Sequence, residues 1–169
     1  MTRRPLKVRI PLVLIAALSA IITTACSKGN VNSNAEGFSV LEIVNADSGR
    51  VYDRRLIETG GEFSIEFIHS VNQSPVRETF IIESGMIKPA AVRFYSFGAG
   101  MLSDMEEGMT MSRDGDAFVI TGFNRQVKEL NYIVGTVSNH MFLINDDSIS
   151  LKDLCGRNAH ITFRTGEIK

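Results

Sequence analysis

Residues 63–80, FSIEFIHSVNQSPVRETF, decide the fold, because apolar residues alternate along both arms of this stretch. Alternation with a period of two is typical of β-strands that bury one face. The apolar set is odd-numbered on the first arm and even-numbered on the second, so odd positions must pair with even ones to share one core. The shortest loop that allows this is residues 72–75, which predicts a hairpin. The predicted cross-strand pairs are Phe67 with Phe80, Ile65 with Ile82, Val71 with Val76, and His69 with Glu78.

The polar members of these faces, His69 and Glu78, are therefore predicted to touch across the hairpin. A carboxylate beside a half-buried imidazole favours the protonated ring and accepts its N–H. The structural interpretation is a hydrogen-bonded link, since buried polar groups need partners. The functional alternatives are a ligand pocket lined by the pair, or catalysis by it.

The rest of the chain after residue 37 also has the periodicity of strands, with Gly, Asn, Asp and Ser at the turns between them. Pro89 cannot donate to a sheet, so its strand must be an edge strand or be bulged near its start. Ser150 and Gly156 bracket a single helical turn. The pattern predicts an all-β domain, an antiparallel β-sandwich or an open barrel. The predicted strands are 38–45, 50–57, 62–71, 76–83, 86–97, 117–121, 130–137, 141–144, 148–150 and 159–164.

The amino terminus is typical of an export signal, with four basic residues before an apolar run over residues 10–22. This run is shorter than the roughly 20 residues that a membrane-spanning helix needs. Residues 23–26, Thr-Thr-Ala-Cys, are similar to a lipobox, so we predict a lipoprotein signal peptide over residues 1–25 and lipidation of Cys26. The alternative is an uncleaved membrane anchor. Thr2-Arg3-Arg4 leaves the general and the twin-arginine export routes open.

Three segments follow from this interpretation: residues 1–25 as signal or anchor, residues 26–37 as a tether, and residues 38–169 as a single β-rich domain. We expect the domain to be held at the membrane, on the extracytoplasmic side of the cell envelope. Without residues 1–25 the chain carries 14 basic and 19 acidic groups, which argues against nucleic acid as a partner. Cys155 is the only other cysteine, so lipidation of Cys26 excludes an intrachain disulfide, whereas a bridge between the two is the competing interpretation.

Residues 98–100, Gly-Ala-Gly, end a predicted strand and form either a bulge or a nest of backbone N–H groups for an anion. Methionines recur at helical spacing over residues 101–109, and Ser103 with Glu106 fits a capping box for one short helix. We expect these methionines to fill the core, the alternative being a soft-metal site. The candidate ligand-binding residues are His69, Arg77, Glu78, Gly98 and Gly100.

Motifs of the common enzyme classes are absent from the sequence: it has no G-x-S-x-G, Walker loop, H-E-x-x-H or C-x-x-C. Ser70 and His69 are adjacent in a predicted strand and point to opposite faces, so they cannot form a catalytic dyad. The three histidines show no ligand spacing. We therefore expect no enzyme, no cofactor and no metal. Arg77 and Arg93 are expected on exposed strand faces, where an anionic solute could use them.

Two motifs resemble the bacterial family called domain of unknown function 1850, whose pattern is near Y-I-H-S-V-x-x-S-P-V-x-E. Residues 67–78 match it with Phe67 in place of the tyrosine, and residues 96–100, SFGAG, resemble a second motif. Residues 140–163 are similar to the family's closing strand, helical turn and strand, and the resemblance covers residues 38–165. It implies association with tripartite (TRAP) transporters of the TAXI type, through a permease or a solute receptor, and no settled activity. We expect a membrane-tethered accessory or binding module of such a transporter. The alternative is an independent envelope lipoprotein that binds a small ligand or a metal.

Overall fold

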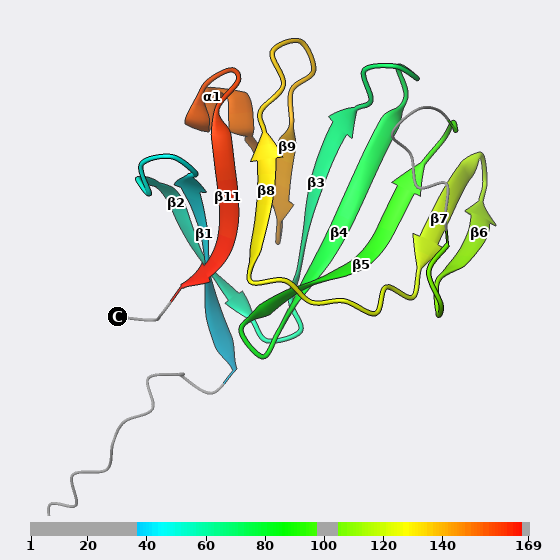
Figure 1. The fold of residues 1–169 in the computed structure, drawn as a ribbon, viewed down its shortest axis with the longest axis horizontal. Coiled ribbons are helices and arrows are strands. Elements are labelled where there is room, and N and C mark those ends of the chain that lie inside the picture. Colours follow the sequence, from blue (N-terminus) through cyan, green and yellow to red (C-terminus); the bar gives the residue numbers. More distant parts are fainter. Residues whose placement is uncertain (1–36, 98–104, 167–169) are drawn as a thin grey trace, which may run out of the picture. The chain divides into compact units, whose positions relative to one another are not determined.

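The computed structural model describes residues 37–97 and 105–166, which contain eleven strands and one helical turn (Figure 1). In chain order these are β1 (Phe38–Asn45), β2 (Val51–Glu58), β3 (Glu62–Ile68), β4 (Pro75–Glu83), β5 (Met86–Phe94), β6 (Thr110–Asp114), β7 (Ala117–Thr121), β8 (Glu129–Ile133), β9 (Met141–Ile144), β10 (Asp147–Ser150), α1 (Leu151–Cys155) and β11 (His160–Gly166).

The strands form two antiparallel sheets, one of four strands in the order β2-β1-β11-β8 and one of seven in the order β10-β9-β3-β4-β5-β7-β6. The first occupies the left of Figure 1 and the second the right. The sheets pack on a shared core and do not close into a barrel. This confirms the all-β prediction. Of the two predicted architectures, the β-sandwich and the open barrel, the β-sandwich is the correct one.

The core is centred on Phe63 of β3, whose ring stacks on Phe80 of β4 at 5.2 Å and on Phe163 of β11 at 5.7 Å. Phe163 comes from the four-stranded sheet, so this cluster joins the two layers. The wider sheet extends beyond its partner, and a second cluster that contains Phe94 and Ile120 covers β5 and β7. Every core residue that the structure describes lies within the compact unit Asn32–Lys169, so a chain that starts at Asn32 keeps this core and should fold on its own. We call it the domain 32–169.

The central hairpin has the predicted parity but a different register. Phe80 pairs with Phe63, and Glu78 pairs with Ile65, so the predicted pairing of His69 with Glu78 is wrong. The connecting loop is longer than predicted and spans residues 69–74, closed by hydrogen bonds from the His69 N–H to the Ser74 carbonyl and from the Gln73 N–H to the His69 carbonyl. The pairing differs from the predicted one by four residues, since Phe80 faces Phe63 instead of Phe67. A shift by an even number of residues leaves every side chain on its predicted face.

The next hairpin, β4–β5, turns through Ser84 and Gly85, which both have positive φ, 52° and 71°. Such two-residue turns match the twist of the strands that they connect. Further along, Thr79 pairs with Ala91 but Phe80 pairs with Pro89, so Ala90 forms a bulge. The bulge predicted near Pro89 is confirmed, although β5 lies inside the sheet rather than at its edge.

Most predicted strands are confirmed, although β3, β5 and β8 end earlier than predicted. The predicted helical turn is confirmed as α1, and Ser150 caps it by accepting the Asp153 N–H. The edge strand β6 was not predicted. The expected helix over residues 101–109 is wrong for its described residues 105–109, which contain a turn at residues 107–108 and no helix. Cys26, Gly98, Gly100, the predicted signal over residues 1–25 and most of the tether lie outside the described residues. Within residues 37–97 and 105–166 no helix has the length and apolarity to cross a membrane.

Candidate functional site

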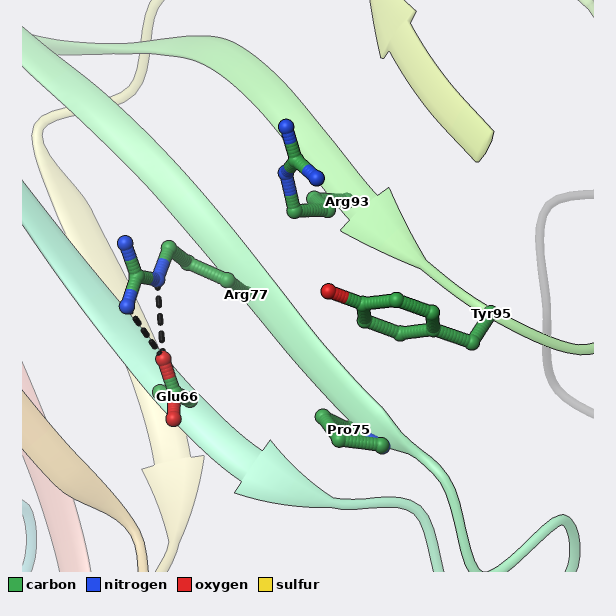
Figure 2. Close-up of a pocket in the computed structure, with 5 residues that line it drawn as sticks. All are labelled: Glu66, Pro75, Arg77, Arg93 and Tyr95. Atoms are coloured by element: carbon green, nitrogen blue, oxygen red, sulfur yellow. Dashed lines mark hydrogen bonds and ion pairs between the residues drawn. The ribbon is translucent and has the colours of Figure 1, made fainter. Parts of the chain in front are cut away.

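A basic pocket of about 420 Å³ lies on the outer face of the seven-stranded sheet (Figure 2). Glu66 on β3, Arg77 on β4 and Arg93 on β5 form one row across three neighbouring strands, because Glu66 pairs with Arg77 and Arg77 pairs with Arg93. Pro75 at the start of β4 and Tyr95 just after β5 complete the lining. In Figure 2 the Tyr95 hydroxyl points away from its own strand, toward the two arginines.

Strand alternation places the arginines outside, since their neighbours Val76 and Phe94 are buried in the second core cluster. Like charges directly opposite each other destabilise a sheet, so the Arg77–Arg93 pair needs compensation. Glu66 provides it on one side, where its Oε2 accepts from Nε and Nη2 of Arg77 at 2.8 and 2.6 Å. Asp114 of β6 provides it on the other side through an ion pair with Arg93.

Both guanidinium groups keep donors for a ligand, because each carries five N–H groups and its acidic partner engages only one or two of its nitrogens. The side chains of Arg77 and Arg93 are 49% and 36% exposed, so solvent reaches them. Hydrogen bonding raises the pKa of Arg93 above its ordinary value, with the larger contribution from Asp114 and the smaller one from Tyr95. The pocket therefore presents two permanent positive charges on adjacent strands.

This arrangement suits a compact oxyanion. A guanidinium binds a carboxylate through two parallel hydrogen bonds, and two guanidiniums side by side can share one carboxylate or hold the two ends of a dicarboxylate. The ion pairs to Glu66 and Asp114 are at the surface, where such pairs contribute about 0–1 kcal/mol. An incoming carboxylate can therefore replace either acid at little cost, and the Tyr95 hydroxyl can donate to the same ligand.

The predicted site residues fall in different places. Arg77 lies in the pocket, as its predicted exposure allows. His69 lies in the β3–β4 loop and lines a separate groove, and Glu78 points from β4 to the opposite, inner face of the sheet. The contact between His69 and Glu78 is thus not formed, and His69, Arg77 and Glu78, the predicted residues that the structure describes, do not share one site. Gly98 and Gly100 are outside the described residues.

Glu78 has a different partner, the hydroxyl of Tyr132 on β8, which donates a hydrogen bond to its Oε2 and so connects the two sheets. Burial raises the pKa of Glu78, although the Tyr132 hydrogen bond and the charge of Arg125 oppose the shift. Burial, and then the Glu78 charge, raises the pKa of Tyr132. The phenol therefore stays protonated and donates. The buried carboxyl of Glu78 thus has Tyr132 as its hydrogen-bond partner, instead of the predicted His69.

Sequence reasoning missed Tyr132 and Tyr95. Tyr132 lies between Leu130 and Val134 in an alternating segment, so its inward direction was readable, but its proximity to Glu78 depends on how the two sheets stack. Tyr95 follows the residue that ends β5 and was assigned to the strand itself. Within the described part of the chain no group of three or more His, Cys, Asp or Glu side chains is close enough to hold a metal ion.

Comparison with known proteins gives one family. Residues 63–151, more than half of the chain, match the family model described as Domain of unknown function (DUF1850). This match is narrower than the resemblance over residues 38–165, but it includes the whole basic pocket, Glu78 and Tyr132. The comparison with curated proteins found no match. The comparison with solved structures found none either. The chain belongs to the family of domain of unknown function 1850.

Proposed function

We propose that this protein is a membrane-tethered binding module that takes up a small carboxylate-bearing solute in the basic pocket. The observation that carries the proposal is the direct pairing of Arg77 with Arg93 on adjacent strands, beside the Tyr95 hydroxyl. Glu66 and Asp114 compensate these two like charges in the free protein, and an anionic ligand would take over that role from either acid. Glu66 and Asp114 are exposed, and their ion pairs with the arginines are weak enough for a ligand carboxylate to displace either acid.

The module would serve a tripartite transporter of the TAXI type, by presenting the solute or by contacting the permease or its solute receptor. This part of the proposal is supported by family membership, by the transporter association that the sequence resemblance implies, and by the export signal expected over residues 1–25. The domain would then stand outside the cytoplasm, held by lipid on Cys26 or by an uncleaved anchor.

Calorimetric titration of the domain 32–169 with malonate and succinate tests the binding step, with inorganic phosphate and neutral malonamide as comparison ligands. We expect binding of the dicarboxylates and none of malonamide. Arg93→Gln should weaken binding about tenfold or more, since a hydrogen bond to a charged group contributes about 1.5–3 kcal/mol. Arg157→Gln is the matched control, because Arg157 is exposed and lies outside the pocket. Equal losses in both variants, or flat titrations with every anion, would overturn the proposal. Tighter binding of phosphate would change the ligand class.

Affinity capture of the full-length protein from membranes, after mild crosslinking, tests the transporter link. Recovery of a tripartite permease or solute receptor is expected, with loss of recovery when the bait is omitted. Recovery of the protein without either one would favour the alternative, an envelope lipoprotein that binds its ligand independently. Mass spectrometry of the same sample reports whether Cys26 carries lipid.

A further inference from the structure

A second groove, of about 430 Å³, lies between the β3–β4 loop (residues 69–74) and the β8–β9 loop (residues 134–140). These loops are at the end of the sandwich opposite the first residue of β1, in the upper part of Figure 1. The groove is separate from the basic pocket and shares no lining residue with it. Its main lining residues are Phe67, Ile68, His69, Val137, Ser138 and His140.

Two imidazoles from loops far apart in the sequence, those of His69 and His140, line this groove. Nδ1 of His140 accepts the Gly135 N–H at 3.2 Å, and Nδ1 of His69 accepts the Val71 N–H at 3.3 Å. An imidazole that accepts at Nδ1 carries its proton on Nε2 in the neutral form. Each ring thus offers an N–H donor, and neither Nε2 offers the lone pair that a metal ion requires. Burial lowers the pKa of His140, which keeps that ring neutral.

A third donor comes from Ser138, whose hydroxyl oxygen accepts the Ile68 N–H at 3.0 Å and so keeps its own hydrogen for another partner. No acidic side chain is among the described residues that line the groove. The loop that carries Ser138 is tightly built, because a Cβ on Gly135 would lie 2.3 Å from the Ser138 carbonyl oxygen. Backbone hydrogen bonds to the Ser138 hydroxyl and to both imidazoles fix where these three side chains lie.

The walls of the groove are apolar. The Phe67 ring stacks on His140 at 4.9 Å, with an angle of 24° between the ring planes. Ile68 and Val137 stand at the rim and are 41% and 95% exposed. Exposed aliphatic side chains beside a cluster of hydrogen-bond donors are typical of a site for a ligand with a polar head and an apolar tail.

We propose that this groove binds a monocarboxylate with a short apolar tail, independently of the dicarboxylate site proposed above. The carboxylate accepts from the imidazoles of His69 and His140 and from the Ser138 hydroxyl. The tail lies against Phe67 and the rim residue Val137. An anion fits because all three groups donate and no acid opposes it.

The test is a titration of the domain 32–169 with acetate, butyrate and hexanoate, followed by NMR of the histidine side chains. Affinity should rise about threefold to fourfold for each methylene group that becomes buried. Hexanamide, the neutral counterpart of hexanoate, should bind more weakly. The free protein should show both groove histidines as the Nε2–H tautomer.

Variants locate the site. His69→Asn keeps an oxygen where Nδ1 accepts from the backbone but removes the Nε2 donor, and it should weaken hexanoate binding about tenfold. His160→Asn is the control, because His160 is exposed on β11 and outside the groove. Val137→Asp adds a negative charge at an exposed rim position that the fold does not need. It should reduce binding more than Val137→Asn, which removes only the apolar contact with the tail.

Equal affinity for all three carboxylates, or unchanged binding in both His69→Asn and Val137→Asp, would overturn the inference. If hexanoate shifts the signals of Arg77 and Arg93 but not those of the histidines, the groove is wrong and the basic pocket takes both ligand types. If malonate has no effect while hexanoate binds at the histidines, the proposed function fails and the groove stands.

Discussion

The link between the two sheets through Tyr132 and Glu78 leads to a quantitative prediction for Tyr132→Phe. The substitution removes the hydroxyl that donates to the Glu78 carboxylate and leaves the ring, which packs edge-on against Phe163 at 5.9 Å. A hydrogen bond to a charged group contributes about 1.5–3 kcal/mol. We therefore expect the free energy of unfolding of the domain 32–169 to fall by about 1.5–3 kcal/mol at pH 8.

The pH dependence of this loss gives a second, independent check. Burial already raises the pKa of Glu78, and removal of the donor that stabilises its charged form should raise that pKa further. At pH 5 the carboxyl holds a proton for more of the time and needs the phenol less. The difference between Tyr132→Phe and the wild type should therefore be smaller at pH 5 than at pH 8.

Urea unfolding at both pH values measures the effect. Tyr95→Phe is the control, because Tyr95 is exposed on the outer face and its variant should stay within about 0.5 kcal/mol of the wild type. A loss below about 0.5 kcal/mol for Tyr132→Phe at both pH values would refute the buried contact. A loss that grows toward pH 5 would refute the assignment of Glu78 as its acceptor.

Other predictions concern titration, reactivity and backbone. Burial raises the folded pKa of Glu78 above the ordinary 4.5, so stability contributed by this group falls as pH rises through that folded pKa, and Glu78→Gln should remove this part of the pH profile in urea unfolding. Burial alone would raise the pKa of Glu42, but hydrogen bonds from Arg164 and then Arg54 hold this pKa below 4.5. Glu42→Gln should therefore lower the free energy of unfolding by about 1–3 kcal/mol at pH 7. This loss should disappear as the pH falls through the folded pKa of Glu42. Burial raises the pKa of Cys155 to about 11, so a disulfide reagent should label it on the order of a hundredfold more slowly than free cysteine at pH 7.5, and equal rates would contradict its burial. Gly122 has φ +83°, and a Cβ there would lie 2.2 Å from the Gly108 carbonyl oxygen, so Gly122→Ala should cost more in thermal unfolding than Gly115→Ala, where nothing lies within 4 Å.

Several strands were predictable because short runs rich in apolar and β-branched residues stand between turn residues. The segments Phe38–Asn45, Ala117–Thr121 and Met141–Ile144 have the predicted bounds. The strand β6 was missed because all five of its residues are exposed, so it lacks the apolar alternation that marks a half-buried strand. Its position depends on pairing with β7, which the local sequence does not encode.

The register of the central hairpin shows a limit of pattern arguments. Alternation fixed the face of each residue of β3 and β4, and those faces are correct. It did not fix the length of the loop, because a shift of the pairing by four residues, an even number, preserves every face. The loop over residues 69–74 is set by its own hydrogen bonds and by the Asn72 side chain, which donates to the Ser96 carbonyl.

The basic pocket was within reach of the sequence. A two-residue turn at Ser84-Gly85 places Glu83 opposite Met86, and one bulged residue near Pro89 then places Arg77 opposite Arg93. The Tyr132–Glu78 contact could not be predicted from the sequence, because β8 and β4 belong to different sheets whose relative position follows from packing of the whole core. Only the need of Glu78 for a buried donor was foreseeable.

The most direct test of the proposed binding site is an NMR titration of the domain 32–169 with malonate that follows the arginine Nε–H signals. If the pocket binds the anion, the signals of Arg77 and Arg93 should shift together and saturate, while that of Arg157 stays in place. If no arginine signal moves, or if Arg157 moves as much as the pocket arginines, the site does not bind a carboxylate and the proposed function is wrong.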